Sequence, residues 1–434
     1  MMQSKTSRQI TLNEGVPLKK GGAPSFRLKK REERRSVDSD KIRENFFGIA
    51  DIGRNEDGSI TRLLFSKEYE EAQNRTRTYM EEAGLTTAID PVGNLHGVLR
   101  SENPDAKTIL IGSHLDTVIQ GGAYDGLLGI IAGVEAAREL GESGYKLNHH
   151  LEIIAFNGEE GNDLGGTFGS RCAMGLVPAE EEAYLKKAKA FGLTKDDLLH
   201  SKMDTKDKSC FLELHIEQGN TLWQAGEEIG IVNGIVGLVR YKVTAWGQSN
   251  HAGTTRMEHR KDAMIGLAKL MVKTDRLARD YGNHMAATFG KVEVTPHAVA
   301  VIPGKAEAVL EIRNLDRELL ERFFEDLKNL AQELEPISFT FEKLVEKTPQ
   351  ACDKRIMEIM ETLCREKHIP HRVMPSGATH DSVAMAHNMP IGMIFVPSKD
   401  GISHNGAEYT KWSQVMTGIR LLCETVKAVD KLHI

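Results

Sequence analysis

The sequence predicts an α/β protein in which a mostly parallel sheet carries helices on both faces and is interrupted by a smaller α+β domain. Short apolar runs that are typical of buried strands alternate along the chain with helical stretches. The pattern changes between about residues 236 and 345, where apolar and polar residues alternate. The 434 residues also exceed the size at which one hydrophobic core usually stops growing, which favours two domains.

Two helices are expected first, one from Asp40 and one after Ser66, a residue type that favours the N-cap position. Four apolar runs then predict the buried strands of the main sheet. These runs are residues 108–111, 151–156, 211–214 and 391–396, and a helix is expected at 127–140. Because strands and helices alternate, the sheet is expected to be mostly parallel.

The inserted domain is predicted from two alternating runs, 239–245 and 306–312, and from a helical stretch at 262–280. A further helix is expected at 353–367, where the chain returns to the main sheet. The predicted division is a flexible basic tail at 1–39, a catalytic domain formed by 40–235 and 346–434, and an insert at 236–345. Docking of the tail to an acidic partner remains an alternative to a solvated terminus.

The composition favours a soluble globular protein of the cytoplasm. Hydrophobic residues make up 40% of the chain, charged residues 27%, and the formal net charge is -6. This charge does not provide the basic surface that nucleic-acid binding needs, and no apolar run is long enough to span a membrane. The five cysteines are odd in number and never spaced as CxxC, which favours neither disulfides nor a cysteine zinc site.

Polar motifs follow the predicted strands. The sequence GSHLDT (112–117) comes directly after an apolar run, and GAYDG (122–126) precedes a predicted helix. Ligands for a divalent ion such as zinc or manganese are expected at the carboxyl ends of such strands, and His114 and Asp125 are of the right type. Asp116 is expected to accept the other ring N–H of His114. A structural His–Asp pair is the alternative for either residue alone.

Three further motifs occupy equivalent positions. NGEEG (157–161) holds two adjacent carboxylates, of which one can bind metal while the other accepts a proton. A solvated acidic turn is the alternative. ELHIEQG (213–219) and SHNGAE (403–408) each supply a histidine, which alone would be structural. Four such motifs after four strands of one sheet favour a catalytic metal centre.

The ordered set GSHLDT, GAYDG, EEG, HIEQG and SHNGAE resembles the hydantoinase/carbamoylase branch of the M20 metallopeptidase-like amidohydrolases, from about Asp40 to the C-terminus. This branch includes N-carbamoyl-L-amino acid hydrolases and allantoate amidohydrolases. The resemblance implies a phosphorylase/hydrolase-like catalytic domain and an inserted domain that acts as a lid and mediates homodimerisation. It also implies two divalent ions per subunit, which can be zinc, manganese, cobalt or nickel.

The resemblance further implies a role for each site residue. One ion would bind His114, Asp125 and His215, and the other would bind Asp125, Glu160 and His404. Glu159 would be the general base when a metal-activated water attacks a ureido or amide carbon. GQSNHAGTT (247–255) is similar to the family's lid segment, so His251 is predicted to stabilise the oxyanion. The substrate, which is expected to carry a carboxylate, would contact Gln218, Arg313, Gly377 and His380.

The chain departs from the family pattern at four positions. Ala300 replaces an asparagine that helps to hold the substrate, Thr379 replaces a glycine, and Arg256 and Gly406 replace prolines. Since the five ligands and the base are kept, we expect the same chemistry on an altered substrate. An aminoacylase or dipeptidase on the same scaffold and a non-catalytic binding protein are the alternatives.

Overall fold

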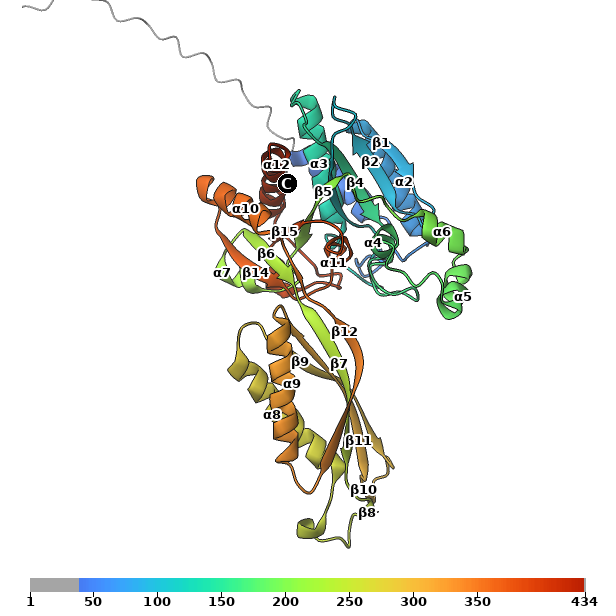
Figure 1. The fold of residues 1–434 in the computed structure, drawn as a ribbon, viewed down its shortest axis with the longest axis vertical. Coiled ribbons are helices and arrows are strands. Elements are labelled where there is room, and N and C mark those ends of the chain that lie inside the picture. The colour runs from blue at the N-terminus through green and yellow to red at the C-terminus, as the bar shows by residue number, and fades with distance from the viewer. Residues whose placement is uncertain (1–38, 433–434) are drawn as a thin grey trace, which may run out of the picture. The chain divides into compact units, whose positions relative to one another are not determined.

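The computed structural model describes residues 39–432, so the predicted basic tail lies outside the described residues except for Ser39 (Figure 1). The larger sheet has the strand order β1-β2-β4-β3-β5-β15-β6-β13, and β14 also pairs with β6. Its strands are β1 (Thr86–Ile89), β2 (Leu95–Leu99), β3 (Thr108–His114), β4 (His150–Phe156), β5 (Lys208–Ile216), β6 (Ile229–Ile235), β13 (Gln350–Ala351), β14 (His371–Ser376) and β15 (Ile391–Val396).

The centre of this sheet confirms the predicted parallel arrangement. The strands β4, β3, β5 and β15 are neighbours and run parallel, and they are the four strands that the apolar runs predict. All residues of β3, β4 and β15 are buried, which explains why their sequences are apolar throughout instead of alternating. Antiparallel pairs appear only toward the two edges, at β1–β2, β2–β4, β15–β6 and β13–β6.

Helices cover both faces of the larger sheet, as predicted. Successive residues of a strand point to opposite faces. Ile111 of β3 packs against α3 near Gly133, whereas its neighbour Leu110 belongs to a core cluster with Ala173 of α4 and Met385 of α11. The helices outside the insert are α1 (Ser39–Ala50), α2 (Lys67–Glu82), α3 (Leu127–Glu142), α4 (Phe168–Ala173), α5 (Glu182–Ala190), α6 (Lys195–His200), α7 (Thr221–Ala225), α10 (Lys354–Glu366), α11 (Ser382–Met385) and α12 (Trp412–Asp430).

The second sheet is antiparallel and has the order β12-β7-β11-β9. Its strands are β7 (Gly237–Trp246), β9 (Ala286–Thr295), β11 (Lys305–Asn314) and β12 (Ser338–Lys347). The helices of this part of the chain are α8 (Ala263–Tyr281) and α9 (Arg317–Gln332). Alternate residues of β7, from Val239 to Ala245, share a core with both helices. The opposite face carries charged side chains, among them Arg240, Lys242, Glu307 and Glu311. The sheet begins at Gly237 and ends at Lys347, while the domain limits at 236 and 345 remain a prediction.

Two whole-chain features complete the description. No helix within residues 39–432 is long and apolar enough to cross a membrane. The five cysteines are all buried and free. Because burial raises the pKa of Cys172 and Cys210 to about 12, these thiols remain protonated near neutral pH.

Gly129 of α3 lies so close to the sheet that a side chain cannot be accommodated. A Cβ atom at this position would lie 2.5 Å from the carbonyl oxygen of Leu214 and 2.7 Å from Cβ of Ser113. We therefore expect Gly129→Ala to lower the free energy of unfolding by ~1–3 kcal/mol, because α3 must move away from β3 and β5. Gly141→Ala is the matched control, since a Cβ atom there meets nothing within 4 Å.

Thermal or denaturant unfolding of the two variants measures this difference. Gly141→Ala should be neutral or stabilising by up to ~1 kcal/mol, because alanine favours a helix over glycine. Equal stability of the two variants would contradict the proposed close contact of α3 with the sheet.

Candidate metal centre and active site

The predicted ligands meet at the carboxyl edge of the parallel strands. His114 is the last residue of β3, and His215 lies one residue before the end of β5. The loop after β4 carries the two adjacent glutamates, and the loop after β15 carries His404. Because neighbouring parallel strands end at the same edge, residues that are far apart in sequence come together there.

Asp125 lies between two groups of ligand atoms. Its Oδ1 is 3.1 Å from Nε2 of His215 and 3.4 Å from Nε2 of His114. Its Oδ2 is 3.5 Å from Nε2 of His404, and that nitrogen is 3.4 Å from Oε1 of Glu160. Within each group the potential ligand atoms lie within 4.8 Å of one another. One carboxylate therefore faces two candidate ion positions with different oxygens, which is the arrangement a bridging ligand needs.

The two buried imidazoles are oriented by backbone carbonyl groups. Nδ1 of His114 donates to the carbonyl oxygen of Asp116 at 2.9 Å, and Nδ1 of His215 donates to that of Ile216 at 3.0 Å. With the proton on Nδ1, each ring presents Nε2 and its lone pair toward Asp125.

The predicted role of the Asp116 side chain is therefore wrong. Its carboxylate is 3.8 Å from Nδ1 of His114, and it instead accepts three backbone N–H groups of the glutamate loop. The donors are Gly158, Glu159 and Glu160, at 3.0, 3.1 and 2.9 Å. Backbone N–H groups at a buried turn need a hydrogen-bond acceptor. The Asp116 carboxylate supplies it for these three groups and so is not available to the His114 ring. Asp116 thus holds the loop of the predicted base and also orients a predicted ligand.

The glutamate loop brings negative charge into a buried position. Oε2 of Glu159 lies 3.9 Å from Nε2 of His114, and the side chain is 9% exposed. Burial raises the pKa of Glu159 well above its ordinary value, and burial together with Asp125 raises the pKa of Glu160 to about 8. Carboxylates so close together cannot all ionise unless positive charge is supplied. Imidazole nitrogens and carboxylate oxygens are suitable donors for zinc, manganese or related divalent ions, so the residues fit the implied metals.

Gln218 lies at the candidate metal centre itself. It has a positive φ of 59°, and its Nε2 donates to Oδ2 of Asp125 at 2.7 Å. Its Oε1 is buried and has no hydrogen-bond partner among the described residues. A buried amide oxygen without a partner is available to a cation or to a donor on a substrate. This position agrees with a substrate contact, which stays a prediction.

The other predicted substrate residues are divided between a contact across the two sheets and the core of the larger sheet. Nη1 of Arg313, at the end of β11, donates to the carbonyl oxygen of Gly377 at 2.7 Å. His380 is 2% exposed, and its ring centroid is 4.5 Å from that of His215. Burial lowers the pKa of His380 well below its ordinary value, so the ring is neutral. It packs edge-on against the ring of His215. Arg313 and Gly377 are therefore brought together, while His380 packs against a ligand.

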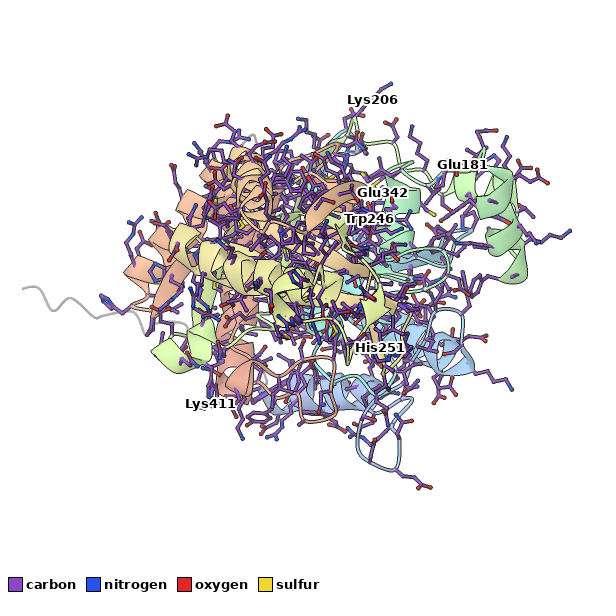
Figure 2. The ribbon with its side chains drawn as sticks, turned by 90° about the horizontal axis from the view of Figure 1, so that it is seen from below. Glu181, Lys206, Trp246, His251, Glu342 and Lys411 are labelled. Carbon is purple, nitrogen blue, oxygen red and sulfur yellow. The ribbon has the colours of Figure 1, made fainter. Side chains whose placement is uncertain are left out.

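His251 is not brought to the candidate centre of its own chain. It lies on β8 (Asn250–His251), paired with Val301 of β10 (Val301–Ile302), and it follows the far end of β7. The ten residues of β7 extend for roughly 30 Å from Gly237, which separates His251 from the start of the insert. The side chain is exposed at this end of the insert, onto which Figure 2 looks. Nδ1 accepts the backbone N–H of Gly253 at 3.0 Å, so Nε2 is the donor that His251 offers.

Glu408 is a site residue whose role the sequence did not reveal. Its Oε1 accepts the backbone N–H groups of Tyr124 and Asp125 at 2.8 and 3.1 Å. Glu408 belongs to the loop of His404 and therefore fixes one ligand-bearing loop against another. The only signal in the sequence was an acidic residue four positions after a predicted ligand, which is too common to predict this contact. A Cβ atom at Gly122 would lie 2.1 Å from its carboxyl carbon, so the contact also requires that glycine.

A parallel α/β sheet with a His/Asp/Glu centre at its carboxyl edge and an inserted antiparallel sheet defines a class of hydrolase-like proteins. The sequence model of Peptidase family M20/M25/M40 matches residues 110–428. The chain belongs to this family.

Within the family the chain is similar to amidohydrolases. It is 36% identical to an N-carbamoyl-L-amino acid amidohydrolase of Geobacillus stearothermophilus, over 90% of this chain and 98% of that protein. It is 35% identical to an allantoate amidohydrolase of Escherichia coli K12, over 88% and 95% of the two chains. The crystal structure of a hydantoinase/carbamoylase family amidase from Burkholderia multivorans superposes with a TM-score of 0.82 at 26% identity, covering 90% and 98%.

Proposed function

We propose that this protein is a dinuclear metal-dependent amidohydrolase that cleaves a linear C–N bond in an N-carbamoyl-L-amino acid or an allantoate-like substrate. The position of Asp125 between two groups of ligands is the observation that carries the proposal. The similarity to N-carbamoyl-L-amino acid and allantoate amidohydrolases over most of both chains supports the substrate class.

In the proposed site the first cation would be held by His114, Asp125 and His215, and the second by Asp125, Glu160 and His404. When bound, the cations would make water more acidic and polarise the carbonyl group of the substrate. Glu159 would take the proton of the attacking water and return it to the leaving nitrogen. Its buried position near His114 supports this role, because burial brings the proton affinity of a carboxylate closer to neutral pH.

The substrate would be oriented from the side of the insert. Arg313 presents a planar guanidinium beside Gly377, and this group can bind a carboxylate with two parallel hydrogen bonds. Gln218 would contact the ureido group from the opposite side. One observation favours an acylated substrate over a carbamoylated one. Ala300 and Thr379 replace residues that the family uses near the substrate.

A panel of N-carbamoyl-L-amino acids, allantoate, N-acyl amino acids and dipeptides tests the substrate class. Release of free amino acid or ammonia from the carbamoylated compounds, with higher kcat/KM than for the acylated ones, is the expected result. A preference for acylated compounds or dipeptides would favour the aminoacylase or dipeptidase alternative. Binding without turnover of any compound would favour a non-catalytic protein.

We also propose that the protein is a homodimer through the inserted domain and that His251 of the partner subunit completes each site. Since His251 lies at the far end of the insert, it can act only where a second chain brings it near the ligands. An Nε2–H donor on an imidazole is suitable for stabilising an oxyanion.

Mixing two inactive variants tests this arrangement. We expect Glu159→Gln and His251→Ala to be nearly inactive alone and to recover about a quarter of the wild-type activity after their subunits are exchanged, because a mixed dimer has one intact site. Analytical ultracentrifugation monitors the dimer. A lack of recovery in demonstrably mixed dimers would contradict the role of His251 in a neighbouring chain.

A further inference from the structure

Lys347 belongs to a row of residues that crosses three strands of the inserted sheet. Strand pairing places Lys347 of β12 opposite Leu238 of β7, and Leu238 opposite Arg313 of β11. Directly paired residues of antiparallel strands point to the same face of a sheet. Lys347 therefore shares a face with Arg313, opposite to the face on which Val239 and Tyr241 form the core with the helices. Two strand spacings separate their backbones by about 10 Å.

This end of the face is directed toward the candidate active site. Arg313 donates to the carbonyl oxygen of Gly377. Gly377 directly follows β14 of the larger sheet. The charges of Arg171 and Glu159, which both belong to the catalytic part of the chain, act on the ammonium group of Lys347. Burial lowers the pKa of Lys347, and Arg171 and Arg240 lower it further, against the opposite effect of Glu159.

Four other cations of this face each form an ion pair with an acidic neighbour. Glu311 pairs with both Arg240 and Arg313, and Glu307 pairs with both Lys242 and Lys305. Among residues 39–432 no carboxylate lies within 4.0 Å of the Lys347 ammonium group. Three arginines repel the Lys347 ammonium group, and among the strongest influences on it Glu159 is the carboxylate that opposes them. A cation in such surroundings attracts an anionic group from solution.

We propose that Lys347 binds a second anionic group of the substrate, so that the enzyme prefers N-carbamoyl or N-acyl amino acids with an acidic side chain. This inference rests on the proposed function. Arg313 would hold the α-carboxylate, and Lys347 would hold the side-chain carboxylate from the neighbouring strand. Two long, flexible side chains about 10 Å apart at their backbones can converge on two carboxylates of one amino acid.

The kcat/KM values of N-carbamoyl-L-aspartate and N-carbamoyl-L-glutamate, compared with that of N-carbamoyl-L-valine, test the proposal. The wild type should prefer the acidic substrates. In Lys347→Met this preference should fall by ~10-fold or more, mainly through KM, because a charge-assisted hydrogen bond is lost. Lys343→Met is the matched control: Lys343 lies on the same strand but faces the helix side, opposite Tyr241, and should keep the preference.

Three outcomes would overturn the inference. These are the absence of the preference in the wild type, its persistence in Lys347→Met, and an equal loss of kcat/KM for acidic and neutral substrates in Lys347→Met. The last result would assign Lys347 to the α-carboxylate. Circular dichroism verifies that both variants fold. Turnover of N-carbamoyl-L-valine separates the two proposals, because it supports the proposed function whatever Lys347 does. Calorimetric titration of N-carbamoyl-L-glutamate into Glu159→Gln, with and without Lys347→Met, should show weaker binding in the double variant.

Discussion

Replacing Glu159 by glutamine is expected to lower kcat by ~10²- to 10⁴-fold while leaving the metal content unchanged. Glutamine has nearly the same shape as glutamate but cannot take a proton from the attacking water. Glu159 is 3.9 Å from the nearest predicted ligand nitrogen and takes part in neither of the two ligand groups that contain Asp125. The loss should therefore appear in turnover and not in metal binding.

The adjacent residue provides the sharpest control for this prediction. Glu160 follows Glu159 directly in the same loop, but its Oε1 lies 3.4 Å from Nε2 of His404, within a ligand group. Glu160→Gln should therefore reduce the amount of bound metal as well as activity. Elemental analysis of both purified variants, together with kcat on an N-carbamoyl-L-amino acid, measures the difference. If Glu159→Gln loses metal and Glu160→Gln does not, the two roles are reversed.

Removing the metal is expected to abolish activity, and adding back zinc, manganese, cobalt or nickel is expected to restore it. Without cations, Asp125, Glu159 and Glu160 place carboxylates together in a buried region, where burial raises the pKa of Glu160 to about 8. Bound cations would remove this repulsion and stabilise the folded state. A metal at a hundredfold excess over its Kd adds about 2.7 kcal/mol to the free energy of unfolding, so chelation should also lower Tm.

Ligand variants separate the two predicted ions. Asp125→Asn should weaken both, because the two oxygens of Asp125 face different groups. His404→Ala should weaken only the ion that it shares with Asp125 and Glu160. Metal-to-protein ratios before and after dialysis against a chelator provide the measurement. Activity that survives complete chelation would refute a metal-dependent mechanism.

The sequence by itself determined the central sheet and which residues are predicted as ligands. The apolar runs at 108–111, 151–156, 211–214 and 391–396 all became parallel strands, because a strand buried on both faces must be apolar along its length. Each predicted ligand lies at the end of one of these strands or in the loop that follows it. Parallel pairing then brings them to one edge, and this consequence needs no further information about the tertiary structure.

Only the tertiary structure decided which partner each of these groups contacts. Asp116 holds the glutamate loop instead of the His114 ring, and Glu408 fixes the loop of Asp125, because backbone N–H groups at those turns point toward these carboxylates. The row that joins Lys347 to Arg313 depends on the register of three strands that are distant in sequence. Periodicity and spacing are local properties of a chain. Register, loop approach and the surroundings of a charge arise from contacts between distant segments, so the fold had to be known before they could be assigned.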